Sequence, residues 1–190
     1  MSVQISRDEA WNLLSEWVES PSLRRHCLAV ETAMRAYAER FGEDVEMWGV
    51  VGLLHDMDYE RYPDLGTGHP RMALAELERR DADPVVVRAI ASHADFLGVP
   101  RETLMEKTLY AVDELSGFIL ACAAVRPDGL QGLTAKSVKK KLKQPSFAAA
   151  VNREDVRRGA DELGVDFDEH VNFVAAALAE RADQLLPTAA

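Results

Sequence analysis

The chain has 190 residues and a mass of 21.0 kDa, which fits one domain, because single cores grow to roughly 150 to 200 residues before chains tend to divide. With 47% hydrophobic and 28% charged residues, the composition is that of a globular protein and excludes long disorder and collagen-like repeats. The net charge of -10 argues against wrapping nucleic acid, whose affinity comes largely from neutralised phosphates. An anionic ligand would therefore have to be held locally.

The two cysteines, Cys27 and Cys122, lie among apolar residues and lack CxxC spacing, so we expect neither a disulfide nor a thiolate zinc site. The first nine residues lack the apolar segment of a signal peptide, and no window offers about 18 uninterrupted apolar residues. We therefore expect a cytoplasmic protein that has neither a membrane nor nucleic acid as its partner.

Apolar residues recur every three or four positions in the first part of the chain, which predicts helices. Ser6 to Glu9 has the form of a capping box and opens a first helix that stops before Pro21. The next helix is expected at 23–41, where Gly42 ends it. A third helix, from 44 to about 56, is apolar on nearly all faces, as a central buried helix would be.

Residues 59–69 are rich in turn formers and predict a loop. Helices are expected after it at 70–80 and 84–93, each opened by a proline, and at 102–125. Three more helical stretches follow, with Asn152 and Asp166 as N-caps, and 187–190 is expected to be a frayed tail. Apolar and polar residues nowhere alternate over a long stretch, as they would in a β-strand. The sequence therefore predicts an all-α fold in a single domain over residues 1–190.

Histidines and aspartates gather at the expected helix ends. Any one of them alone is more often a hydrogen-bonded core residue, a cap or half of an ion pair. Asp113, however, lies inside an apolar helix, where an unpaired carboxylate is costly to bury and a cation would remove that cost. A mixed set from several helices is how bundles build sites for Fe, Mn, Zn, Ni or Co. The predicted metal ligands are His26, His55, Asp56, His69, His93 and Asp113.

The order of these residues resembles the HD-domain superfamily of metal-dependent phosphohydrolases. The resemblance covers roughly residues 20 to 120 and rests on His26, on His55 and Asp56 within Gly-Leu-Leu-His-Asp-Met-Asp, and on Asp113. In that superfamily these four positions bind a metal. His69 and His93 resemble the two extra ligands of branches that hold two metals.

The resemblance implies a compact HD-domain helical bundle at about 20–125 with additional C-terminal helices at about 130–187, and one or two divalent transition-metal ions per chain. The segment from Lys136 to Asp155 also resembles a branch of HD hydrolases whose substrate it does not name. Cyclic-dinucleotide phosphodiesterases are not implied, because Met57 and Asp58 stand where those enzymes have Ile-Gly, and their Gly-Tyr-Pro signature is absent.

The charge of such a site indicates its chemistry. Two divalent cations, neutral histidines and the carboxylates Asp56 and Asp113 would leave about +2, which attracts phosphate. Asp56 is the expected bridging carboxylate, and a metal-bound hydroxide would attack phosphorus. Asp58 would either protonate the leaving oxygen or orient a ligand histidine, and orientation is the favoured of these two roles.

A basic segment follows the expected ligands, since residues 134–158 carry a net charge of +6 and the rest of the chain carries -16. Such a run is often only the solvated face of a helix. Its functional interpretation is a lid that binds a substrate phosphate through Lys139, Lys140 and Arg153. His170 has no place in the HD motif and is expected on a helix surface.

Three functions remain open at this stage. The favoured one is a metal-dependent phosphohydrolase that acts on a small phosphorylated molecule, a nucleotide first among them. The alternative is a di-iron oxygenase that uses the same six ligands. A non-catalytic nucleotide-binding regulator is the third, and the intact ligand set argues against it.

Overall fold

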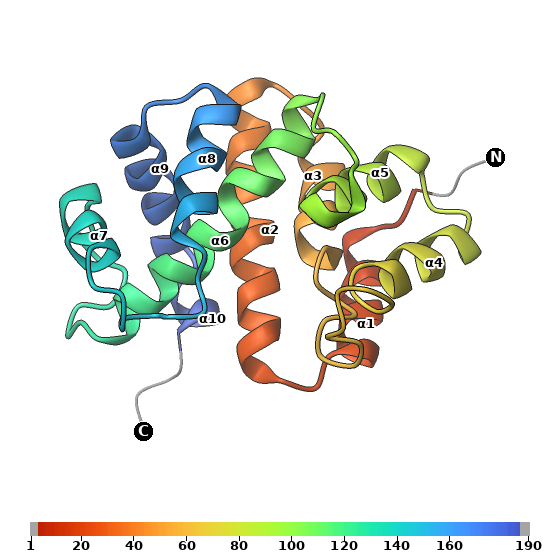
Figure 1. The fold of residues 1–190 in the computed structure, drawn as a ribbon, viewed down its shortest axis with the longest axis horizontal. Helices are drawn as coiled ribbons and strands as arrows, with labels where there is room; N and C mark the ends of the chain where they lie inside the picture. Colours follow the sequence, from red (N-terminus) through yellow and green to blue (C-terminus); the bar gives the residue numbers. More distant parts are fainter. Residues whose placement is uncertain (1–3, 187–190) are drawn as a thin grey trace.

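The computed structural model describes residues 4–186 and, within this range, contains ten α-helices, one short 3-10 helix and no strand (Figure 1). The all-α prediction is confirmed. The expected tail at 187–190 lies outside the described residues. In chain order the elements are α1 (Arg7–Trp17), α2 (Pro21–Phe41), α3 (Val45–Leu54), α4 (Arg71–Arg79), α5 (Pro84–Ser92), η1 (Asp95–Leu97), α6 (Leu104–Ala124), α7 (Ala135–Leu142), α8 (Arg153–Leu163), α9 (Phe167–Ala179) and α10 (Ala182–Leu185).

Helices α2 and α6, the two longest, run through the middle of the molecule and carry the other helices on both sides (Figure 1). Helix α3 packs against α2, and all of its residues from Trp48 to Leu54 are buried, which confirms that it is a central helix. A Cβ atom at Gly52 would lie 2.9 Å from the backbone of Glu31, so only glycine permits this approach of α3 to α2.

The capping chemistry explains where the helices begin. The capping box from Ser6 to Glu9 is present, and Asn152 and Asp166 cap α8 and α9, as the sequence predicts. Helix α2 begins two residues earlier than expected, because Ser20 caps it and Pro21 occupies its first position. Helix α3 ends at Leu54, and a series of turns follows. The sequence pattern does not predict η1 or the short α10.

The C-terminal helices lie against the central pair. Helix α8 packs along α6, and a Cβ atom at Gly159 would come within 2.6 Å of the Ala111 Cα atom. This close approach places the first turn of α8 beside the part of α6 that carries Asp113. No helix among residues 4–186 combines the length and apolar character needed to cross a membrane. Cys27 and Cys122 are buried, free thiols, as expected.

The prediction that His170 lies on a helix surface is wrong. Its side chain is fully buried, because α9 packs against both α2 and α6. Its Nε2 atom lies 3.0 Å from the Ala111 carbonyl and donates to it, so Nδ1 accepts from the Tyr37 hydroxyl at 2.6 Å. Burial lowers the pKa of His170, which keeps the ring neutral and suited to joining three helices.

This lowered pKa predicts a pH dependence of stability. His170 binds a proton less readily in the folded chain than in the unfolded one, so this residue lowers the free energy of unfolding as the pH drops from 7 to 5. In His170→Gln the free energy of unfolding should therefore fall less over this range than in the unchanged protein. Urea denaturation at pH 7, 6 and 5 measures it. An identical fall in both proteins would show that His170 does not contribute.

Candidate metal centre

Six side chains converge where α2, α3, α5 and α6 meet the loop after α3. His26 lies in α2 and Asp113 in α6, while His55 and Asp56 directly follow the last residue of α3. His93 is the C-cap of α5. His69 comes from the loop before α4. Helix C-terminal ends supply three of the six donors, His55, Asp56 and His93, because a residue just beyond the last turn can point away from its own helix.

Four of the donors form a first cluster. Asp113 Oδ1 lies 3.0 Å from His26 Nε2 and 3.3 Å from His55 Nε2, and the two Nε2 atoms are 3.3 Å apart. Asp56 Oδ2 is 3.6 Å from each of these nitrogens. Ligand atoms about 2.1 Å from one ion in tetrahedral geometry lie about 3.4 Å apart, so this spacing fits a transition-metal ion.

The remaining histidines form a second cluster with the other oxygen of Asp56. Asp56 Oδ1 lies 3.5 Å from His69 Nε2 and 3.6 Å from His93 Nε2. One carboxylate therefore offers Oδ2 to the first cluster and Oδ1 to the second, and all donor atoms within each cluster lie within 4.8 Å of one another. A carboxylate placed in this way could be shared by two ions, which is the role expected of Asp56 from the sequence.

Hydrogen bonds made by Nδ1, the ring nitrogen that points away from the cluster, fix the orientation of His55 and His93. Nδ1 of His55 lies 2.8 Å from the Gly52 carbonyl, and Nδ1 of His93 lies 2.5 Å from the Ile90 carbonyl. Since a carbonyl only accepts, each Nδ1 carries the proton and each Nε2 is left with a free lone pair. The rings are therefore held in the tautomer that binds a metal through Nε2.

Asp58 plays the same part for His69. Its side chain is fully buried, with Oδ1 2.8 Å from His69 Nδ1 and Oδ2 accepting from the Ala73 backbone N–H at 2.8 Å. Both oxygens are engaged, and Asp58 does not line the cavity described below. Of the two roles considered from the sequence, this geometry supports orientation of a histidine and not protonation of a leaving group.

The electrostatics of the cluster call for a positive charge. Burial disfavours protonated His55, yet the charges of Asp56 and Asp113 outweigh it and raise the pKa of His55 to about 9. Burial also disfavours the ionised Asp113, but His55 and His26 hold the pKa of that carboxyl well below its usual range. A divalent cation in place of the His55 proton would supply this positive charge and satisfy the carboxylates and the histidine nitrogens at once.

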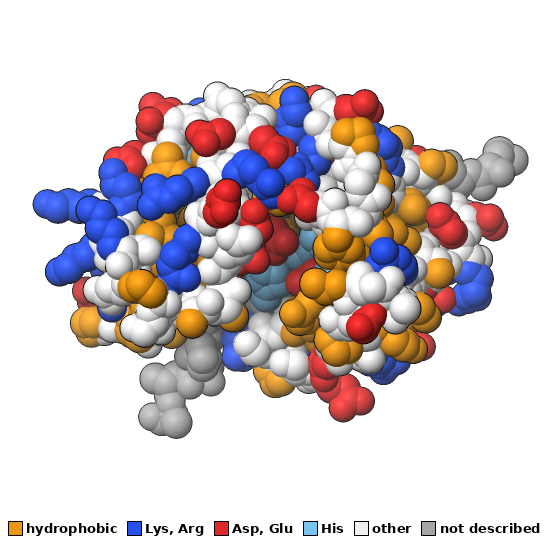
Figure 2. Space-filling view, in the orientation of Figure 1, with side chains coloured by type: hydrophobic (Ala, Val, Ile, Leu, Met, Phe, Trp, Pro, Cys, Tyr) orange, Lys and Arg blue, Asp and Glu red, His pale blue; other side chains and the backbone are white. Residues whose placement is uncertain are grey.

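A cavity of about 750 Å³ opens above the two clusters. Figure 2 shows histidine side chains at the bottom of this hollow, with charged side chains above it and apolar ones beside it. The exposed apolar side chains of the lining are Tyr59, Leu65 and Phe96, the last of them in η1. The charged side comes from η1 and from the first turns of α8, and its residues include Asp95, Glu154, Asp155 and Arg158.

The three basic residues predicted to hold phosphate do not line this cavity. Lys139 pairs with Asp168 at 2.6 Å, and Lys140 is exposed on α7. Arg153 donates to the backbone carbonyls of Leu142, Gln144, Phe147 and Val151 and so fixes the segment before α8. Arg158 lines the cavity instead, although it belongs to the same basic segment.

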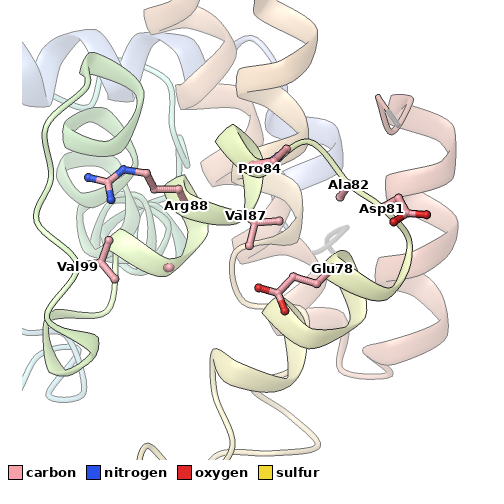
Figure 3. Close-up of a pocket in the computed structure, with 8 residues that line it drawn as sticks. Glu78, Asp81, Ala82, Pro84, Val87, Arg88 and Val99 are labelled. Carbon is pink, nitrogen blue, oxygen red and sulfur yellow. The ribbon is translucent and has the colours of Figure 1, made fainter. Parts of the chain in front are cut away.

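A second cavity of about 680 Å³ lies between α4 and α5 (Figure 3). Its lining is largely apolar and also includes the charged residues Glu78 and Asp81, as well as Arg88 from the same helix as Pro84 and Val87. It contains no histidine, and none of its residues belongs to either cluster. The centre described above is therefore the better candidate for chemistry.

The two clusters predict a metal content of two ions per chain. His93→Ala leaves the second cluster with two donors, so the variant protein should bind one ion per chain, in the first cluster. Asp113→Ala should lose the ion of the first cluster. Elemental analysis of metal-loaded protein measures this, and circular dichroism checks the helical fold. His170→Gln is the matched control and should keep both ions. Two ions in His93→Ala would remove His93 from the ligand set.

Asp58 predicts a separate effect on affinity. Asp58→Ala frees His69 to rotate, so the affinity for the second ion should fall about 10- to 100-fold while the first ion stays bound. A competitive metal titration measures both affinities. The control is Asp64→Ala, which removes an exposed carboxylate from the same loop. Unchanged affinity in Asp58→Ala would mean that its hydrogen bond does not position His69.

The comparison with family models matches the HD domain over residues 23–117, which is half of the chain and contains all six clustered donors. No curated protein and no solved structure gave a match. The family match and the two His/Asp clusters agree with the order of ligands seen in the sequence. The chain therefore belongs to the HD-domain family of metal-dependent phosphohydrolases.

Proposed function

We propose that this protein is a metal-dependent hydrolase that cleaves a phosphate ester of a small molecule. The observation that carries the proposal is the pair of donor clusters that share Asp56 at the bottom of an open cavity. Imidazole and carboxylate donors suit Fe, Mn, Zn, Ni or Co. When bound, such ions supply Lewis acidity and lower the pKa of a coordinated water.

The charge at the bottom of the cavity favours a phosphate group. With two divalent ions, the carboxylates Asp56 and Asp113 leave about +2, because the histidines are neutral when they act as ligands. A phosphate monoester carries about two negative charges near neutral pH and matches this charge. The same surplus stabilises the negative charge that develops on phosphorus oxygens during attack.

The reaction balances with water as the only co-substrate. The oxygen of a water molecule forms a bond to phosphorus, the bond from phosphorus to the ester oxygen breaks, and that oxygen leaves with a proton as an alcohol. Asp56 holds the two clusters in fixed relation, and Asp58 keeps His69 aligned. Since the cavity is open, solvent can supply the proton that the leaving oxygen takes.

A metal and substrate screen tests this proposal. Protein reconstituted separately with each of the five metals should release phosphate from a panel of nucleotides, sugar phosphates and an aryl phosphate. His55→Ala should lower kcat at least about 100-fold, because it removes a first-cluster donor, whereas His170→Gln should retain it.

Two outcomes would contradict the proposal. Iron-loaded protein that consumes dioxygen when moved from anaerobic to aerobic buffer, without releasing phosphate from any substrate, would favour the oxygenase alternative. Tight nucleotide binding without turnover in any metal form would favour the regulator.

A further inference from the structure

The walls of the metal cavity differ in charge from its bottom. Apart from the histidines, Arg158 is the one basic residue among the cavity-lining residues that the structure describes. Four carboxylates lie outside the metal clusters, from Asp95, Glu114, Glu154 and Asp155. A bound anion therefore finds positive charge at the metals and negative charge along the wall formed by η1 and α8.

Arg158 is already committed to neighbours. Its guanidinium bonds to Asp95, to Asp155 at 3.0 Å and to the Tyr110 hydroxyl, whose distance from Nε is 2.7 Å. Arg101, the next basic residue behind this wall, bonds to Asp95 at 2.7 Å and to Glu162 at 2.6 Å and stacks on Tyr110 at 3.7 Å. The four lining carboxylates and Glu162 outnumber these two guanidinium groups, so the wall stays negative after the ion pairs form.

In the first turn of α8, which faces the cavity, several backbone donors are already occupied. The Asn152 side-chain oxygen accepts from the N–H groups of Glu154 at 3.0 Å and Asp155 at 3.4 Å. The Asn152 N–H itself donates to Glu114 at 3.2 Å. Glu154 and Asp155 add negative charge where the helix dipole is positive, so this helix end is not an anion site.

A rim of exposed apolar side chains also borders the cavity, and Phe96 in it belongs to η1, directly after Asp95. Tyr59, Leu65 and Phe96 line the cavity with 45%, 49% and 47% of their surfaces exposed. Two of them are aromatic and can stack on a planar ring. In Figure 2 apolar side chains flank the hollow on the side away from the charged wall. An organic group placed between this rim and the acidic wall would meet a flat apolar surface and several hydrogen-bond acceptors.

Resting on the proposed hydrolase function, we propose that the cavity takes a molecule with a single phosphate, whose organic group is uncharged or positively charged and donates hydrogen bonds. Nucleoside monophosphates fit this chemistry. Nucleoside di- and triphosphates do not, because a second and third phosphate would meet the carboxylates of the wall, where Arg158 is the one basic lining residue and is already paired with Asp95 and Asp155. Like charges brought together in one cavity disfavour binding.

Equilibrium binding tests the charge limit without requiring turnover. Metal-loaded protein should be titrated with a nucleoside mono-, di- and triphosphate that share one base, and metal content should be measured after each titration because triphosphates chelate divalent cations. Affinity should fall at least about tenfold from mono- to triphosphate. Affinity that is equal or that rises with phosphate number would overturn the inference.

A charge-reversal variant locates the effect. Glu154→Lys changes the wall by two charges, so the ratio of monophosphate to triphosphate affinity should fall about tenfold. Glu43→Lys makes the same change at an exposed residue between α2 and α3 that does not line the cavity, and it should leave the ratio unchanged. Equal ratios in Glu154→Lys and Glu43→Lys would show that the wall does not set the preference.

The hydrolysis assay separates this inference from the proposed function. Phosphate release from a triphosphate that exceeds release from the monophosphate would refute the charge limit and leave the hydrolase proposal standing. Monophosphate binding without release in any metal form would refute the hydrolase proposal, and the binding series would still decide the charge limit.

Discussion

The Asp56 carboxylate, shared between two groups of donors, is the constraint on which the centre depends. Its two oxygens lie 3.5 to 3.6 Å from four histidine nitrogens that come from four different parts of the chain. Each of those parts must stop or turn at the right place for its nitrogen to reach. The helix boundaries are therefore as much a part of the centre as the ligands, and the close approach of α3 to α2 at Gly52 holds His55 opposite His26.

The order of histidines and aspartates was sufficient to predict which six residues meet, because five of them lie in or directly after predicted helices and His69 lies in the turn-rich loop between two of these helices. The tautomers could not be predicted, since they depend on whether a carbonyl such as that of Ile90 faces Nδ1. Sequence alone also left Asp58 with two roles. Its contacts with His69 and the Ala73 N–H arise only once the loop folds onto α4.

Two errors from the sequence have one cause, which is that a helix surface can face another helix instead of solvent. His170 appeared to be a surface residue, yet α9 lies between α2 and α6 and buries it. The lysines of α7 appeared to face a substrate, yet the apolar side of that helix packs toward α9 and directs Lys139 to Asp168. Periodicity identifies the apolar face of a helix but not its partner.

The family match ends at residue 117, whereas the cavity wall extends to Arg158. The metal donors thus lie in the shared HD region and much of the wall lies in the C-terminal helices. The two parts are joined tightly, because Gly159 packs on Ala111, two residues before Asp113 in the same helix. Tyr110, in the same turn, bonds to Asp155 and Arg158. Helix α6 therefore fixes the distance between the donor clusters and the wall, so that, under the proposed function, the charges on α8 would act on a substrate without any change in the donor set.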